Sequence, residues 1–226
     1  MLKFRYFQIR VPCSFDELAR MAVSGGADNS TPEIGVVKQL KGQIFLRSSF
    51  TRFIAANTLS NDGVIVATNV PTVDVYAIRI FVENKKLFLC CSDPPRGSRF
   101  VSEILSKILR EDNYFFESIE INHELISKHI VNFSGCKLVS AKVRDFHVYN
   151  GAVGRLEISS QDGLAEDIAP FLKGKHYKID ALAYAISHGL SHGLIYFSRN
   201  GTLRVSDALA EIAIPLFESA LGEFYT

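Results

Sequence analysis

Two stretches of this sequence, Ile80–Leu89 (IFVENKKLFL) and Ile195–Val205 (IYFSRNGTLRV), share the same order of residue types. In each, β-branched and aromatic residues flank an Asn-containing turn, which predicts a β-hairpin. A Ser-Asp pair follows each stretch, at Ser92-Asp93 and at Ser206-Asp207, and apolar residues at helical spacing come after it. Both stretches therefore predict a hairpin that leads into a helix.

The repeated unit predicts an α+β fold with two mainly antiparallel sheet lobes, each closed by a C-terminal amphipathic helix. A degenerate internal duplication would explain the repetition. Aligning Asn84 with Asn200 and Leu87 with Leu203 requires a gap, however, and the unit is common in proteins, so shared secondary structure is the alternative explanation. The polar break at Glu111-Asp112-Asn113 predicts a β-rich N-terminal lobe over residues 1–112 and a C-terminal lobe over residues 113–226.

The strand candidates of the N-terminal lobe are short and separated by turn residues, which favours an antiparallel sheet. A first helix is expected after the cap residue Ser14, and a second over Ser98–Arg110, where apolar residues recur at helical spacing. The expected strands are Leu2–Val11, Gly35–Leu40, Gln43–Ser48, Arg52–Thr58, Val64–Thr68, Val73–Val82 and Leu87–Cys91.

The C-terminal lobe carries a strong hairpin signal at Asn150-Gly151. Helices are expected over residues 122–133 and 164–172, and from Asp207 onward, where Pro215 either kinks the axis or opens a second segment. The expected strands are Tyr114–Ile121, Lys137–Tyr149, Ala152–Ser159, Tyr177–Ser187, Leu194–Ser198 and Thr202–Val205.

Composition limits the classes of protein that the chain can represent. Its 226 residues are 47% hydrophobic and 22% charged, which excludes intrinsic disorder. No apolar run approaches the roughly 20 residues of a membrane-spanning helix. Lys3, Arg5 and Arg10 interrupt the N-terminal apolar residues, so we expect a cytoplasmic protein with no signal peptide. The formal net charge of +1 means that any nucleic-acid binding must depend on local clusters of cations.

Metal and cofactor sites are not expected from the sequence. The four cysteines lack metal-ligand spacing and are expected to be buried thiols. His123 and His129 are six residues apart, which is wrong for a zinc-binding helix. His188 and His192 have the right spacing, but two glycines favour a loop there. A hydrolase of nucleotides or nucleic acid using His188, His192 or Asp145 is the enzymatic alternative.

The strongest binding signal is a row of cations on paired strands. Alternation places Lys142 and Arg144 on one face of their strand, and the returning strand adds Arg155, with Glu157 reducing the net charge. The first strand contributes Lys3 and Arg5 to one of its own faces. Such rows bind phosphate backbones because each contact releases condensed counterions. An ordinary solvated sheet face is the alternative, which the near-zero net charge favours.

A second anion site is expected at the start of the helix predicted over Ser98–Arg110. Arg96 and Arg99 flank the cap residue Ser98, and the first backbone N–H groups of a helix attract anions. A Pro-Pro turn that merely leads into a capped helix is the alternative.

These observations favour a non-enzymatic binding or regulatory protein with nucleic acid, DNA included, as its preferred ligand. The expected phosphate contacts are Lys142, Arg144, Arg155, Arg96 and Arg99. A protein-binding subunit of a larger assembly, or a homodimer formed through aromatic strands, is the third hypothesis.

Overall fold

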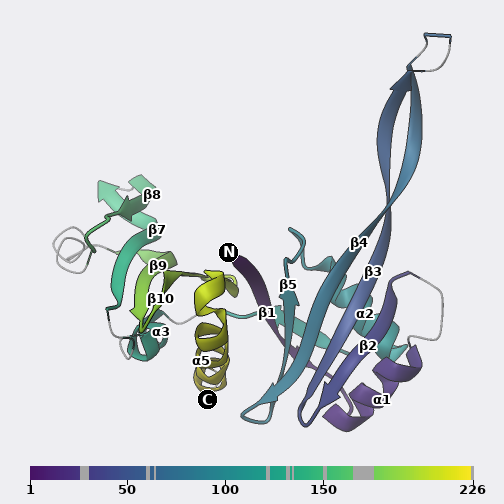
Figure 1. The fold of residues 1–226 in the computed structure, drawn as a ribbon, viewed down its shortest axis with the longest axis horizontal. Helices are drawn as coiled ribbons and strands as arrows, with labels where there is room; N and C mark the ends of the chain where they lie inside the picture. Colours follow the sequence, from purple (N-terminus) through teal and green to yellow (C-terminus); the bar gives the residue numbers. More distant parts are fainter. Residues whose placement is uncertain are drawn as a thin grey trace. The chain divides into compact units, whose positions relative to one another are not determined.

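The computed structural model describes residues 1–25, 31–59, 62–63, 65–120, 123–130, 133, 135–149, 152–164 and 176–224 (Figure 1). The chain folds into two compact units. Unit 1 consists of Met1–Gln8, Glu83–Pro94 and Glu117–Thr226, and unit 2 consists of Ile9–Val82 and Pro95–Phe116. Each unit is built from more than one segment. The single boundary expected after Asp112 stays a prediction, as does the internal duplication.

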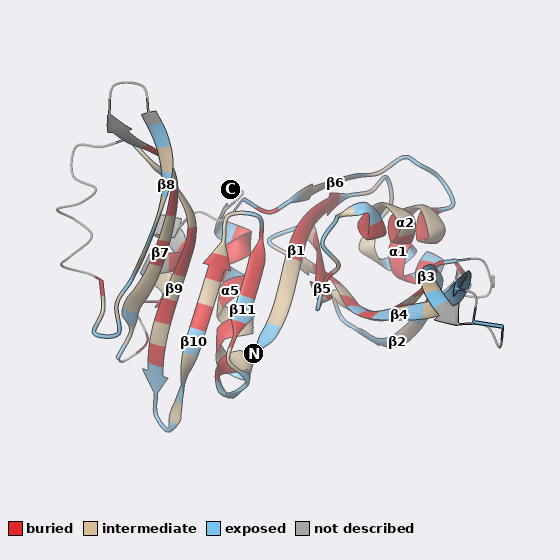
Figure 2. Ribbon diagram, turned by 90° about the horizontal axis from the view of Figure 1, so that it is seen from above, coloured by how far each residue is buried: buried red, intermediate tan, exposed pale blue. Residues whose placement is uncertain are grey.

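Unit 2 packs two helices on one face of a three-stranded antiparallel sheet (Figure 2). Its core joins Tyr76 to Phe50 and Phe100, with ring centroids 5.6 Å and 6.1 Å apart. The six apolar residues that predict the second helix are all buried, which confirms that helix. The elements are α1 (Phe15–Gly25), β2 (Glu33–Leu40), β3 (Gln43–Leu59), β4 (Ile65–Glu83) and α2 (Arg99–Leu109).

The first helix, α1, begins with a reciprocal cap. The backbone N–H of Glu17 donates to Ser14 Oγ at 3.3 Å, and the backbone N–H of Ser14 donates to Glu17 Oε2 at 2.9 Å. These bonds satisfy two donors that the first helical turn would otherwise leave unpaired. The hydrogen bonds from Ser14 lower the pKa of the Glu17 carboxyl.

Strands β3 and β4 correct the expected strand lengths. The breaks expected between Ser48 and Arg52 and between Thr68 and Val73 are wrong, because each pair of short strands is one continuous strand. Pro71 lacks an N–H donor and is tolerated only where a strand edge needs none. Pro71 pairs with Phe53 of β3, and strand β5 (Lys86–Ser92) follows β4 after two residues.

Unit 1 contains one sheet with the strand order β5-β1-β11-β10-β9-β7-β8, and β6 pairs with β1. The helices described in unit 1 are α3 (His123–Ile130), the short 3-10 helix η1 (Asp207–Leu209) and α5 (Ala210–Phe224). The remaining strands are β1 (Leu2–Arg10), β6 (Phe115–Ser118), β7 (Lys137–Tyr149), β8 (Ala152–Ser159), β9 (Lys178–His188), β10 (Ser191–Ser198) and β11 (Thr202–Val205).

Helix α5 covers one face of this sheet. The ring of Phe217 lies 4.9 Å from Tyr6 and 5.5 Å from Phe197, measured between centroids. The hydroxyl of Tyr6 donates to Glu218 Oε1 at 2.9 Å, which satisfies this buried polar pair. Pro215 lies inside α5, which remains one helix.

Most of the expected C-terminal strands are confirmed, and β11 has the expected bounds. The loop expected over Ser187–Gly193 is wrong, because β9 and β10 pair as far as His188 and Ser191 and leave a two-residue turn. The expected turn at Asn150-Gly151 and the expected helix over residues 164–172 fall wholly or largely outside the described residues.

All four cysteines are free thiols, and Cys90 and Cys91 are buried. None of the described helices has the length and apolar content needed to span a bilayer.

Candidate nucleic-acid interface

The strand register of unit 1 brings residues from six strands into two parallel rows on one sheet face. Directly paired residues of an antiparallel sheet point to the same side, so the rows follow from the pairings. We call this surface the row face. The first row is Glu157, Lys142, Ala181, Ser198, Thr202 and Arg5, and the second is Ser159, Ser140, Ala183, Tyr196, Arg204 and Lys3.

The row face is the side of the sheet that α5 does not cover. Residues that alternate with the rows, such as Leu182, Phe197 and Leu203, are buried on the opposite side. Phe197 contacts Phe217 of α5 there. On the row face, Arg204 is exposed and Tyr196 is half-buried. This face is therefore the polar side of a sheet whose other side is core.

Two cations meet directly at one end of the row face. Lys3 and Arg204 are cross-strand partners on β1 and β11. Neither forms a salt bridge with a carboxylate among the residues that the structure describes. Like charges directly opposite each other destabilise a strand pair, so an anion bound between them would relieve the repulsion.

An aromatic ring lies beside this cation pair. The guanidinium carbon of Arg204 lies 5.4 Å from the ring centroid of Tyr196, its neighbour on β10. Arg5 adds a further cation to the first row, and burial lowers the pKa of its guanidinium group. Arg5 also donates from Nη2 to Ser118 Oγ at 3.1 Å. These contacts fix the positions of both guanidinium groups on the row face.

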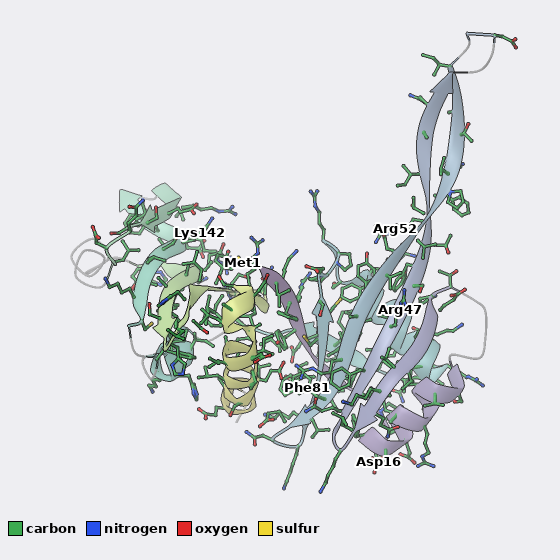
Figure 3. The ribbon with its side chains drawn as sticks, in the orientation of Figure 1. Met1, Asp16, Arg47, Arg52, Phe81 and Lys142 are labelled. Carbon is green, nitrogen blue, oxygen red and sulfur yellow. The ribbon has the colours of Figure 1, made fainter. Side chains whose placement is uncertain are left out.

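The cations predicted on β7, of which Lys142 is labelled in Figure 3, have carboxylate partners. Lys142 Nζ lies 2.7 Å from Glu157 Oε1, and this hydrogen bond raises the pKa of the lysine. Arg144 Nε lies 3.6 Å from Asp180 Oδ1. Both pairs are partly exposed, so they retain some attraction for an external phosphate but less than an unpaired cation does.

Arg155 lies two residues before Glu157 on β8 and therefore shares its face. It is exposed and forms no ion pair with another described residue. The ladder is irregular beside it, since the register shifts between Val143 and Phe146 and Asp145 has a positive φ of 53°. The structure thus places Lys142, Arg144 and Arg155 near one end of the row face.

Arg96 and Arg99 belong to unit 2, where α2 begins. Ser98 makes no side-chain capping bond, and Arg99 Nε lies 2.8 Å from Glu103 Oε1. The adjoining open cleft has a volume of about 430 Å³ and also includes Arg52, whose Nε lies 2.7 Å from Asp74 Oδ2. Both guanidinium groups in this cleft already have carboxylate partners, so it is a weaker anion site than the row face.

The histidines of the enzymatic alternative do not converge. Ser187 pairs with His192 and His188 pairs with Ser191, so the two imidazoles point to opposite faces of the hairpin. Asp145 pairs instead with Lys178, with Nζ and Oδ2 3.2 Å apart. The part of the chain that the structure describes contains no group of three side chains able to hold a metal ion.

No protein-family model matches this chain, and no curated protein sequence matches it. The arrangement of its own side chains is therefore the basis for a functional proposal.

Sequence reasoning missed Arg204 and Tyr196. The alternation of Leu203 and Val205 with Arg204 does place that arginine on the polar side of its strand. The pairing of β11 with β1, which brings Arg204 to Lys3, joins segments about 200 residues apart and has no local signal.

Proposed function

We propose that this protein is a non-enzymatic binding protein that binds single-stranded nucleic acid on the row face of unit 1. The observation that carries the proposal is the cross-strand pair of Lys3 and Arg204 beside the ring of Tyr196. Cations that track a backbone, together with an aromatic platform, are the two elements used by proteins that bind single strands.

The middle of the row face suits a flat ligand. Small, partly exposed side chains lie between its two cationic ends: Ala183 and Ser198. Lys3 and Lys142 are four strands apart, which is about 19 Å at about 4.8 Å per strand. This separation lets a short single strand cross the sheet with phosphates near both ends and its bases over the small residues.

Tyr196 and Arg204 supply a stacking surface beside Lys3, at that end of the row face. Bases splayed from a single strand stack on aromatic rings or on the plane of an arginine guanidinium group. Because Arg204 already lies over Tyr196, a base can stack on the outer side of that guanidinium group. This contact tolerates any base, so we expect weak sequence preference.

Binding is favoured over catalysis by the contacts of the titratable side chains. Asp145 pairs with Lys178, and His188 packs against the ring of Phe133 with centroids 5.6 Å apart. Neither arrangement leaves an acid and a base facing one substrate, as general acid–base catalysis requires.

The test is the salt dependence of oligonucleotide binding, measured by fluorescence anisotropy with labelled single-stranded DNA and RNA of matched sequence. Removal of both cations in Lys3→Ala/Arg204→Ala should weaken binding at least about tenfold and reduce the log–log salt slope by about 1.4, or about 0.7 per lost contact. Lys41→Ala removes an exposed cation from unit 2 and serves as the matched control.

The proposal is wrong if the wild-type chain binds neither oligonucleotide, or if the double variant binds as the Lys41→Ala control does. Preferential binding of RNA or of DNA would identify the natural ligand class. Stronger binding of duplex than of single strands would contradict the stacking role of Tyr196.

A further inference from the structure

Strands β3 and β4 of unit 2 have one face that points away from helix α2. Its cross-strand pairs are Arg47 with Ala77, Ser49 with Val75, Thr51 with Val73, Phe53 with Pro71 and Ala55 with Asn69. We call this surface the outer strip. Near the base of the hairpin, the alternate residues Ser48, Phe50 and Tyr76 are buried on the other face, where Tyr76 contacts Phe100 of α2. Farther along the hairpin, Ile54 and Val70 on that face are 55% and 41% exposed.

The outer strip is both apolar and exposed. Phe53 is 69% exposed, Val73 60% and Val75 47%. Ile65, near the end of the hairpin, is 69% exposed. Scattered exposed apolar residues are ordinary, but a continuous exposed row along one face marks an interaction surface.

The distal part of this hairpin also lacks neighbouring strands. Strand β2 pairs with β3 only as far as Ser49, and β3 continues to Leu59. A two-stranded ribbon alone is at best marginally stable in water, and long unpaired edges normally carry charges that block association. No basic residue occurs between Arg52 and Arg79, and Asp62 is the single acid between Phe53 and Val73.

We propose that the outer strip is a self-association surface on which a second copy of this chain packs face to face and antiparallel. The scarcity of cations makes a nucleic-acid occupant unsuitable. The arrangement of the few charges suits a second copy. Asp62 lies in the turn between β3 and β4 at the tip of the hairpin, and the exposed Arg47, labelled in Figure 3, lies nearer its base. A two-fold axis across the middle of the strip places each Asp62 beside the partner's Arg47 end.

The available area suits a weak dimer. From Arg47 to Leu59, the part of β3 that bears the strip has 13 residues, which span about 43 Å at about 3.3 Å per residue. Two strands are about 10 Å wide, so each copy offers a footprint of about 430 Å². The two copies together bury about 860 Å², an area typical of a weak, concentration-dependent association.

The first experiment is light scattering after size exclusion over a concentration series of the full-length chain. The wild-type chain should be dimeric, and Val73→Lys should raise the dimer dissociation constant at least about tenfold by placing a charge in the strip. Leu190→Lys, at a residue that is 99% exposed in unit 1, is the matched control and should leave the dimer unchanged.

Charge reversal tests the antiparallel arrangement. Asp62→Arg and Arg47→Glu should each weaken the dimer, and the double variant should restore it, because the two charges face each other across the interface. Circular dichroism spectra confirm that each variant is folded.

The proposal is overturned if the wild-type chain is monomeric at every concentration, or if Val73→Lys dimerises as Leu190→Lys does. A monomer that binds phosphatidylcholine vesicles through the strip would assign the surface to lipid instead. Failure of the double reversal to restore association would exclude the antiparallel arrangement.

Discussion

The row face of unit 1 and the outer strip of unit 2 are built in the same way but present opposite chemistry. Each is the side of an antiparallel sheet that lies opposite the helices of its own unit. The row face carries cations, a tyrosine and small polar residues, whereas the outer strip carries Phe53, Val73 and Val75 with almost no charge. The overall net charge of +1 conceals this contrast. Alternate residues along a strand thus determine which partner a sheet can bind, independently of its architecture.

The largest expected effect is a loss of stability on substitution of Phe197, whose side chain lies on the face of β10 opposite to that of Tyr196. Phe197 is buried against α5, and its neighbour Tyr196 lies on the row face. Phe197→Ala should lower the free energy of unfolding by about 3–5 kcal/mol, because it leaves a cavity in the core. Tyr196→Ala should change stability by less than about 1 kcal/mol but should weaken oligonucleotide binding by about 1–3 kcal/mol through lost stacking.

Urea denaturation and anisotropy of the same samples measure both quantities, with Tyr196→Phe as the control that keeps the ring. A loss of stability at Tyr196 equal to that at Phe197 would mean that the row face is core and not a binding surface.

A smaller effect is expected when a carboxylate that neutralises a cation is removed from either unit. Glu157 neutralises Lys142 on the row face, and Glu103 neutralises Arg99 in unit 2. Glu157→Gln should strengthen oligonucleotide binding and steepen the salt slope by about 0.7, because it releases one cation for a phosphate contact. Glu103→Gln makes the same change of charge in unit 2 and should have a weaker effect. Equal gains from both variants would indicate attraction by net charge alone.

The smallest expected effect concerns the acid stability of unit 2. Hydrogen bonds from Ser14 lower the pKa of Glu17 in the folded chain. The resulting stabilisation is complete above the ordinary glutamate pKa and is lost as the pH falls through the lowered value. Glu17→Gln keeps the cap but does not ionise, so its stability difference from wild type should shrink as the pH falls. Thermal melts of both chains at several pH values measure this difference, and a constant difference would contradict the assigned role of Glu17.

Local patterns predicted the elements whose signals lie within a few residues. Helix α2 follows from its apolar stripe, the cap of α1 from Ser14, and β11 from alternation alone. The prediction divided β3 and β4 wrongly, because polar residues and Pro71 suggest turns. In the structure these residues lie in a long hairpin in which β3 and β4 pair with each other. Propensity cannot distinguish a turn from the exposed part of a long ribbon.

The candidate sites show the same limit. Alternation was enough to place Lys142 and Arg144 on one face of their strand, but their partners Glu157 and Asp180 depend on cross-strand register. The pairing of Lys3 with Arg204 depends on a contact between the two ends of the sequence. Such contacts are set by the packing of the whole unit and leave no periodic trace in either segment.

The buried thiol of Cys91 is a natural probe of local unfolding around β5. Burial raises its pKa to about 12, so at neutral pH almost no thiolate is present to react with an alkylating reagent. Its alkylation rate in the native state therefore reports how often β5 separates from its surroundings, without any introduced label.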